Sequence, residues 1–347
     1  MTNDRPARLV DRPLAWWYRR DVSSRRKWAR LVVSIGTVFL ALWIPFNAEA
    51  PTVDRFSNVM VLAMAAASVS LLTGFSGQIS VGQGAFFGVG AYTTAILVAD
   101  HDWPYLATLL PAALLAFLVG VVVGLPALRV RGLNLALVTL ALAVLFPQVI
   151  KRLDDLTGGT QGKVVPPFEA PEWTSLDVDQ WRYFVILLAL TITVICVRNI
   201  VKSRPGRALV AIRDDEIAAV SQGVHLARYK LAAFGLSAMI AGVAGGLSVT
   251  IKEFVDAGSY GLLLSIQTLV AAVLGGIATF AGPVVGALFL EWVPEWIKDR
   301  GWHEQLAPAF FGSALIVAMM LAPDGIVGRL KRHSATLSAR FSGREDG

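Results

Sequence analysis

The sequence predicts an all-α integral membrane protein with about ten transmembrane helices, broken or re-entrant glycine-rich segments, and both termini in the cytoplasm. Of its 347 residues 55% are hydrophobic and 16% are charged, whereas soluble domains average about 25% charged residues. The apolar residues form long charge-free runs, and basic residues collect in alternate connecting segments. The soluble alternative is a large buried α/β protein, which has no use for so many uninterrupted apolar windows.

Residues 1–30 form a strongly basic N-terminal extension, and the apolar run 31–46 follows it. This order, ending in the sequence AEA at 48–50, is also typical of a signal peptide with its cleavage site. Because many further spans follow, we expect a retained first helix instead. We place the membrane domain at 31–322 and a basic cytoplasmic tail at 323–347.

The later runs supply nine further predicted spans, judged against the roughly 20 residues that a helix needs to cross the hydrocarbon core. Residues 57–99 hold two spans, with a break at 74–78 where glycines lower helix propensity. Residues 257–290 are interpreted as two spans, although one span with a re-entrant segment would also fit. The other predicted spans are 105–128, 132–150, 183–197, 231–251 and 306–321.

The charges of the loops support an even number of spans. Lysine and arginine concentrate in the loops predicted inside, and acidic residues in those predicted outside, with Lys151 and Arg152 as exceptions. The inside loops are 73–80, 129–133, 198–230, a short one near 280, and the tail. The outside loops are 47–56, 100–104, 151–182, 252–256 and 293–305.

Composition and motifs exclude several classes of function. A single cysteine, Cys196, and four histidines far apart in sequence predict neither a disulfide framework nor a metal site. The net charge of +6 fits a cytoplasmic membrane surface better than nucleic acid. The glycine-rich loop 157–163 superficially resembles a phosphate-binding loop, but Thr157 and Val164 stand where that motif needs glycine and serine or threonine. We interpret it as an outside contact loop or a plain turn.

The segment 74–92 (GFSGQISVGQGAFFGVGAY) places glycines and polar side chains in a charge-free stretch. Glycine at this density fits close helix packing and an unwound helix equally well. Broken helices near the midplane expose backbone groups that suit zwitterions, so this segment is the candidate substrate pathway. Its candidate residues are Gly74, Ser76, Gly77, Gln78, Ser80, Gly82, Gln83, Gly84, Phe86 and Tyr92.

A second interruption, at 273–287, stands in the other half of the chain and adds Gly275, Gly276 and Pro283 to the candidate pathway. Paired interruptions of this kind are typical of an internal repeat with the pathway between its halves.

The segment 203–230 predicts a cytoplasmic docking element. Residues 208–220 can form a short helix with a charged, small-residue face, which Gly223 can terminate. An interfacial amphipathic helix is the plainer alternative to a helix that docks on a cytosolic partner and transmits its motion. The candidate coupling residues are Arg213, Asp214, Asp215, Glu216, Ala218, Ala219 and Gly223.

From about residue 58 to 321 the chain resembles the LivM-like permease subunits of branched-chain amino-acid ABC transporters. The resemblance rests on the blocks GQISVGQGAFFGVGAY, RGLNLALVTLALA, LTGGTQG, GRALVAIRDDEIAAVSQGVHLARYKLAAFGLSAMIAGVAGGL and VLGGIATFAGPVVGALF, in that order. Glu216, Ala218, Ala219 and Gly223 match the family's EAA-type loop, which meets the ATPases. Here Ile217 separates the glutamate from the alanine pair. The basic N-terminal extension is not part of the shared pattern.

The resemblance implies an importer of several subunits in the bacterial inner membrane. It would be completed by a second permease subunit that forms a heterodimer with this one, two cytosolic ATP-binding subunits and an extracytoplasmic solute-binding protein. The chain itself would carry no cofactor, since ATP and Mg²⁺ are used by the partner ATPases. Branched-chain amino acids are the expected solute, with urea, amides and other small solutes as the alternative within the family.

Two other classes of function compete with this interpretation. A proton-coupled secondary transporter usually needs a charged or histidine side chain inside the membrane, and the predicted runs contain none. A sodium-coupled carrier that uses backbone carbonyls remains open. An integral-membrane enzyme would need a metal cluster or a catalytic dyad near the interface, which the sequence does not show.

Overall fold

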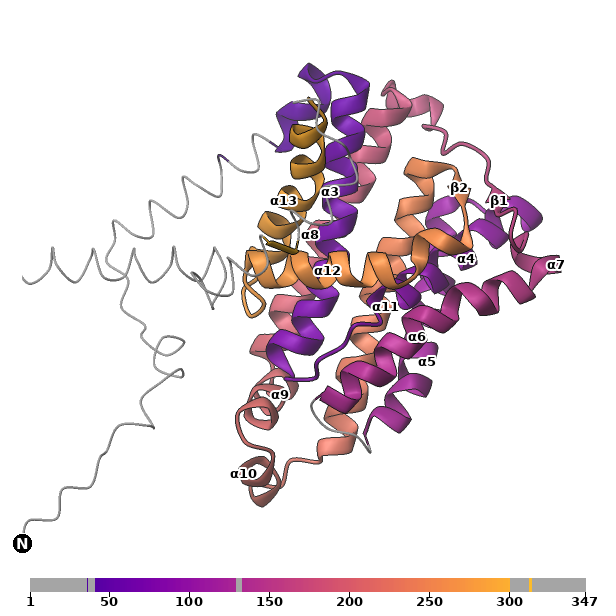
Figure 1. Ribbon diagram of the computed structural model, residues 1–347. Coiled ribbons are helices and arrows are strands. Elements are labelled where there is room, and N and C mark those ends of the chain that lie inside the picture. Colours follow the sequence, from indigo (N-terminus) through magenta and orange to yellow (C-terminus); the bar gives the residue numbers. More distant parts are fainter. Residues whose placement is uncertain (1–35, 37–40, 129–132, 300–311, 314–347) are drawn as a thin grey trace, which may run out of the picture. The chain divides into compact units, whose positions relative to one another are not determined.

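The computed structural model of the protein describes residues 36, 41–128, 133–299 and 312–313 (Figure 1). The chain divides into two units, 1–49 and 50–347. In the first unit, residues 41–47 are helical. The predicted extension and tail, most of the first predicted span and almost all of the last one lie outside the described residues.

Five described helices are long and apolar enough to cross a membrane. Each of them contains a charge-free run of the sequence. The helix α5, for example, covers the predicted run 105–128 almost to the residue. At 1.5 Å per residue, helices of 19 to 27 residues are about 28–40 Å long, against about 30 Å of hydrocarbon. They are α3 (Ala50–Val69) with its continuation η1 (Ser70–Phe75), α5 (Tyr105–Ala127), α6 (Leu133–Arg152), α8 (Val178–Lys202) and α11 (Leu226–Lys252).

The helices of the second unit separate into inner and outer ones. The most apolar windows of α3 and α11 are 83% and 78% buried, whereas those of α5, α6 and α8 are only 22–28% buried. The helix α4 (Gln83–His101) packs between α11 and α5. Apolar outward faces such as Leu110 and Leu188 are what a lipid or protein neighbour in the membrane requires.

The region 257–290 does not form two full spans. The short 3-10 turn η3 (Ala257–Tyr260) leads into α12 (Leu262–Gly275), and α13 (Gly282–Asp299) follows. With 14 residues α12 is about 21 Å long, too short to cross about 30 Å of hydrocarbon. Figure 1 shows α12 lying across the direction of α3. The length of α12 agrees with the re-entrant alternative, and the described residues do not confirm the count of ten spans.

The connecting segments gather at two opposite ends of α3, α8 and α11. One end, here called the sheet end, holds α7 (Asp154–Thr157), η2 (Glu172–Thr174), and the antiparallel strands β1 (Lys163–Val164) and β2 (Phe254–Val255). The other, here called the docking end, holds α9 (Arg204–Asp214) and α10 (Glu216–Ser221) (Figure 1). Of the loops predicted outside, 151–182 and 252–256 meet at the sheet end through the pairing of β1 with β2. At the docking end, the bond from Arg213 to Gly74 joins 198–230 to 73–80.

One predicted helix at the docking end is wrong. Residues 208–220 were expected to form a single helix, but the chain forms two helices that separate at Asp215. Asp215 adopts an extended conformation, and its carboxylate accepts hydrogen bonds from the backbone N–H groups of Ile217 (2.8 Å) and Ala218 (3.1 Å). An aspartate that caps a new helix in this way competes with continuation of the previous one.

Candidate functional site

The long helix that starts as α3 breaks at the docking end. Its last six residues form the π-helix η1, and residues 76–82 are not helical. The chain returns to helix at Gln83, whose side chain is buried inside the molecule. π-Helical turns are rare and are frequent at functional sites. The break predicted at 74–78 is confirmed, and its non-helical part continues to residue 82.

Two glycines explain how the backbone fits at this break. A Cβ on Gly74 would lie 2.0 Å from the carbonyl oxygen of Ile277, in the turn between α12 and α13. Gly77 has a φ of +72°, which side chains disfavour. Phe75 also stacks on Phe280 of the same turn, with ring centroids 5.6 Å apart. The two glycine-rich segments that the sequence singled out therefore lie against each other.

A buried polar network surrounds the first turn of α4. The Nε2 of Gln83 donates to Ser237 Oγ (3.0 Å), while Ser68 Oγ contacts Gln83 Oε1 (3.2 Å). Ser237 Oγ in turn donates to the backbone oxygen of Ser68 (2.8 Å). The N–H of Gly84 donates to Ser265 Oγ (2.9 Å). These bonds connect α3, α4, α11 and α12 at one place, and they satisfy polar groups whose burial would otherwise be costly.

The remaining polar side chains of the break also bond to the protein. Ser76 Oγ donates to the carbonyl of Leu72 (2.6 Å), and Gln78 Nε2 donates to Ser76 Oγ (2.9 Å). Ser80 is fully buried, and its Oγ accepts a long bond from the N–H of Gly82 (3.4 Å). These three bonds join residues at or next to the break to one another.

The two aromatic candidates lie further along α4. Phe86 is buried against Phe234 of α11, with ring centroids 6.0 Å apart, and so belongs to the packed core. Tyr92 packs on Tyr260 (5.9 Å) and Phe146 (6.4 Å). The Tyr92 hydroxyl is buried and has no hydrogen-bond partner among the described residues. A buried unpaired polar group of this kind calls for an explanation, and a role in function is one.

The second interruption forms a tight turn. Gly275 ends α12, and Gly276 has a φ of +118°. Thr279 Oγ1 donates to the carbonyl of Gly276 (2.9 Å) and accepts from the N–H of Gly282 (3.0 Å). Pro283 lies in the first turn of α13, where its missing N–H removes no helical bond. This turn is the one that Gly74 and Phe75 contact.

The docking helix α10 presents an apolar side chain to its surroundings. Ile217 is 82% exposed, whereas Ala219 is buried. Gly223 ends α10 as predicted, with a φ of +80°. The N–H of Val224 bonds to the carbonyl of Ala219 (3.1 Å), and that of Gly223 to the carbonyl of Val220 (2.9 Å), which is a Schellman motif. The short helix thus has a defined end at each side.

The docking helices are bonded to the helix break. Arg213 Nη1 donates to the carbonyl oxygen of Gly74 (2.8 Å), the next-to-last residue of η1. The carboxylate of Glu216 pairs with the ammonium group of Lys230 at the start of α11. The Nε2 of Gln78 donates to the backbone oxygen of the same Lys230 (3.2 Å). Candidate coupling residues and candidate pathway residues therefore form one connected set.

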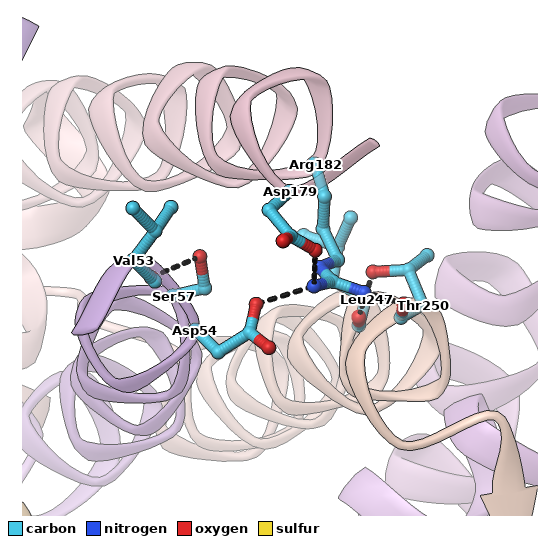
Figure 2. A network of polar contacts seen from close by, with 7 residues as sticks. All are labelled: Val53, Asp54, Ser57, Asp179, Arg182, Leu247 and Thr250. Atoms are coloured by element: carbon cyan, nitrogen blue, oxygen red, sulfur yellow. Dashed lines mark hydrogen bonds and ion pairs between the residues drawn. The ribbon is translucent and has the colours of Figure 1, made fainter. Parts of the chain in front are cut away.

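A buried arginine joins three helices at the sheet end (Figure 2). The guanidinium group of Arg182 in α8 pairs with Asp54 of α3 and with Asp179 (2.6 Å). Its Nη1 donates to the backbone oxygen of Thr250 in α11 (3.0 Å). Nearby, Lys163 of β1 pairs with Asp100 at the end of α4 (2.5 Å). In the described part of the chain, no three histidine, cysteine, aspartate or glutamate residues gather to hold a metal ion.

Sequence reasoning missed several of these residues. Ser68, Ser237 and Ser265 looked like ordinary small residues of apolar runs, and Arg182 stood just outside the run 183–197. The Asp179–Arg182 spacing of three residues, which places both side chains on one helix face, was the available signal. Their distant partners leave no local pattern.

Comparison with known proteins shows similarity to transport permeases. A family profile described as branched-chain amino acid transport system / permease component matches residues 52–322. The chain is 28% identical over 316 residues to the high-affinity branched-chain amino acid transport system permease protein LivM of Escherichia coli K12, covering 84% of this chain and 74% of that protein.

Two further relatives agree. The LivM protein of Salmonella typhimurium LT2 is 27% identical over 331 residues, covering 89% of this chain and 77% of the relative. A probable branched-chain amino acid transport permease protein LivH of Methanocaldococcus jannaschii is 28% identical over 316 residues, covering 81% and 93%. No solved structure matches the chain.

Proposed function

Because the chain belongs to the branched-chain amino acid transport permease family, we propose that it is the membrane-crossing subunit of an ATP-driven importer for branched-chain amino acids. ATP hydrolysis then takes place on separate subunits. The observation that carries the proposal is the family match over residues 52–322, and it is supported by the bonds between the docking helices and the helix break. Those bonds give a cytosolic partner a physical route to the centre of the membrane domain.

The charge pattern supports the orientation of the chain. The docking end carries the basic residues of 198–230, so we place it in the cytoplasm, and the sheet end outside. The described spanning helices carry their charged residues near their ends, as in Asp54 and Arg182, and not in their centres. A proton-coupled carrier would need a titratable group there. Energy supplied by a partner ATPase fits this pattern better.

The centre of the molecule suits a small zwitterion. The helix α4 begins there, so the positive end of its dipole and the neighbouring hydroxyls of Ser68, Ser237 and Ser265 lie around one point. These groups would meet a carboxylate when the break opens, without a fixed charge in the membrane. Urea, amides and other small polar solutes remain the alternative, because hydroxyl and backbone groups also bind neutral amides.

The remaining partners follow from the exposed surfaces. The apolar outer faces of α5, α6 and α8 are available to lipid and to a second, related permease subunit. The sheet end would receive a solute-binding protein. Ile217 on α10 would insert into an ATPase subunit, since this 82% exposed apolar side chain lies at the end that we place in the cytoplasm, and buried apolar anchors carry much of the energy of an interface.

Docking is tested by a matched pair of substitutions. Ile217→Asp places a charge on α10, and Val164→Asp places the same charge on a 74% exposed side chain at the opposite end. We expect Ile217→Asp to reduce co-purification with the ATPase subunits at least about tenfold, because apolar anchors carry much of an interface. Val164→Asp should leave co-purification with the ATPases unchanged. Equal retention of the ATPases by both variants would contradict the proposal.

The energy source and the solute are tested in proteoliposomes that contain the complete complex. We expect uptake of labelled leucine to require ATP on the side of the membrane that carries the ATPase subunits. Excess isoleucine or valine should reduce this uptake. Excess urea or acetamide should have no effect. Uptake driven by a sodium or proton gradient without ATP would favour the secondary transporter.

A further inference from the structure

Arg213 lies at the end of α9, where α9 contacts the helix break. We propose that Arg213 is a positioning residue that transmits the movement of α9 and α10 to the π-helix η1, and through it to the start of α4. The inference rests on the proposed function, because it assumes that an ATPase moves the docking helices. It goes beyond that function by naming the bond through which the movement passes.

The bond itself is well oriented. Arg213 Nη1 donates to the carbonyl oxygen of Gly74 at 2.8 Å. The other side of the guanidinium group, Nε and Nη2, donates to one carboxylate oxygen of Asp214 at 3.1 and 3.0 Å. A planar guanidinium held on one edge points its opposite donor in a fixed direction. The Arg213 side chain is 29% exposed, so water screens this bond less than it would screen one on an open surface.

The backbone of the break packs closely against the Arg213 side chain. A Cβ on Gly77 would lie 2.7 Å from Cγ of Arg213, so only glycine leaves room for the side chain there. The carbonyl that Arg213 binds lies in the last turn of η1, where carbonyls lack a partner within the helix. Arg213 supplies that partner. Without it, the end of the π-helix would be left to water or to a rearranged turn.

A second, indirect connection runs from α10 to the break through Lys230 of α11. Glu216 of α10 pairs with Lys230 of α11, and Gln78 donates to the backbone of the same Lys230. The break is therefore bonded on both sides of Gly77, at Gly74 and at Gln78. A displacement of α9 acts directly on the Gly74 carbonyl, whereas a displacement of α10 reaches Gln78 through Lys230 of α11.

The displaced segment ends at the candidate solute site. Residues 76–82 connect Gly74 to Gln83 without a helix or a strand between them. Gln83 is bonded to Ser237 and contacts Ser68, and these bonds tie the start of α4 to α11 and α3. A pull on the Gly74 carbonyl would therefore be passed along residues 76–82 to the start of α4, where the candidate solute site lies.

The test uses the complete complex in proteoliposomes and compares Arg213→Gln with Arg207→Gln. Arg207 lies on the same helix, and among the described residues its side chain bonds to the nearby carbonyl of Lys202. Both variants remove one charge from α9. Three quantities are measured for each: co-purification with the ATPases, the rate of ATP hydrolysis, and labelled leucine taken up per ATP hydrolysed.

We expect Arg213→Gln to retain the ATPases within about twofold and to reduce leucine uptake per ATP at least about tenfold, because one hydrogen bond of a charged group accounts for a tenfold effect. Arg207→Gln should match the unchanged complex in all three measurements. Arg213→Lys, which keeps a donor but loses the tie to Asp214, should lie between them. If Arg213→Gln does not fold, Asp214→Asn releases the guanidinium without removing it and should lower the same ratio.

Different failures have different meanings. An uptake ratio for Arg213→Gln equal to that of Arg207→Gln would overturn the inference while leaving the proposed function intact. Loss of ATPase binding by Arg213→Gln would also overturn it, because the residue would then be a docking contact. Absence of ATPases from the unchanged chain would instead refute the proposed function.

Discussion

Replacing Arg182 by methionine tests how the sheet end is held together. The guanidinium group joins α8, α3 and α11 through Asp54, Asp179 and the backbone of Thr250 (Figure 2). Methionine keeps most of the length and apolar stem of the side chain, and so removes the charge with little change in packing. Two carboxylates that face one arginine would then face each other.

The magnitude follows from burial. The Arg182 side chain is 5% exposed, and removing one partner of a buried pair costs about 3–5 kcal/mol. The Asp54 and Asp179 side chains are 37% and 31% exposed, so water can stabilise the carboxylates that remain. We therefore discount the expected loss in free energy of unfolding to about 2–3 kcal/mol.

A triple variant separates charge from shape. Arg182→Met combined with Asp54→Asn and Asp179→Asn leaves no uncompensated charge, and neutral replacements of whole ion clusters are often tolerated. We expect it to recover at least half of the loss. Lys163→Met is the control, since its pair with the 39% exposed Asp100 contributes about 1 kcal/mol or less.

The assay is unfolding of the purified chain by a denaturing detergent, followed by the fluorescence of its ten tryptophans. Arg182→Met should shift the midpoint far more than Lys163→Met does. A shift no larger than that of the control would refute the account of the cluster. So would a triple variant that is no more stable than Arg182→Met alone.

Three further substitutions test the centre of the molecule. Gly84→Leu should abolish leucine uptake, because even a Cβ there would lie 2.6 Å from both the Gly261 carbonyl and Ser265 Oγ, and normal uptake would show that α4 and α12 are not in contact. Gln83→Met should lower the free energy of unfolding by about 1–3 kcal/mol in the same detergent assay, because it removes the buried hydrogen bonds of the Gln83 side chain with Ser237 and Ser68; an unchanged midpoint would contradict the network. Tyr92→Phe should leave stability unchanged or raise it by up to about 1 kcal/mol, because it removes a buried hydroxyl that has no partner among the described residues, and a clear loss of stability would show that the hydroxyl is bonded.

Much of the fold is predictable from the sequence because crossing a bilayer imposes a local rule. A run without charge and of sufficient length becomes a helix, so α5 and α6 follow their predicted runs closely. The break at 74–78 is also local, since glycine both weakens the helix and allows the close approach at Gly74. Hydropathy does not determine how a helix is oriented relative to its neighbours. The sequence of α12 therefore predicts a span, whereas in the structure α12 lies across α3.

The candidate sites are predictable only in part. The glycine-rich and acidic segments indicate where function concentrates, but the bond from Arg213 to Gly74 joins residues 139 positions apart. The pair of Arg182 and Asp54 spans 128 positions. Such pairings depend on how helices pack, and no local spacing encodes them. The division of the docking helix at Asp215 is different, because an aspartate is a strong helix N-cap and carried that signal.

The central claim is that the docking end faces the cytoplasm and the sheet end the outside. It is tested most directly by replacing Cys196 with serine and introducing Ile217→Cys or Val164→Cys, two highly exposed positions at opposite ends. Intact spheroplasts that hold the chain without its ATPase subunits, so that no partner covers residue 217, are treated with a membrane-impermeant maleimide. We predict labelling of the Val164→Cys chain at once and of the Ile217→Cys chain only after permeabilisation. Labelling of Ile217→Cys from outside would contradict the account.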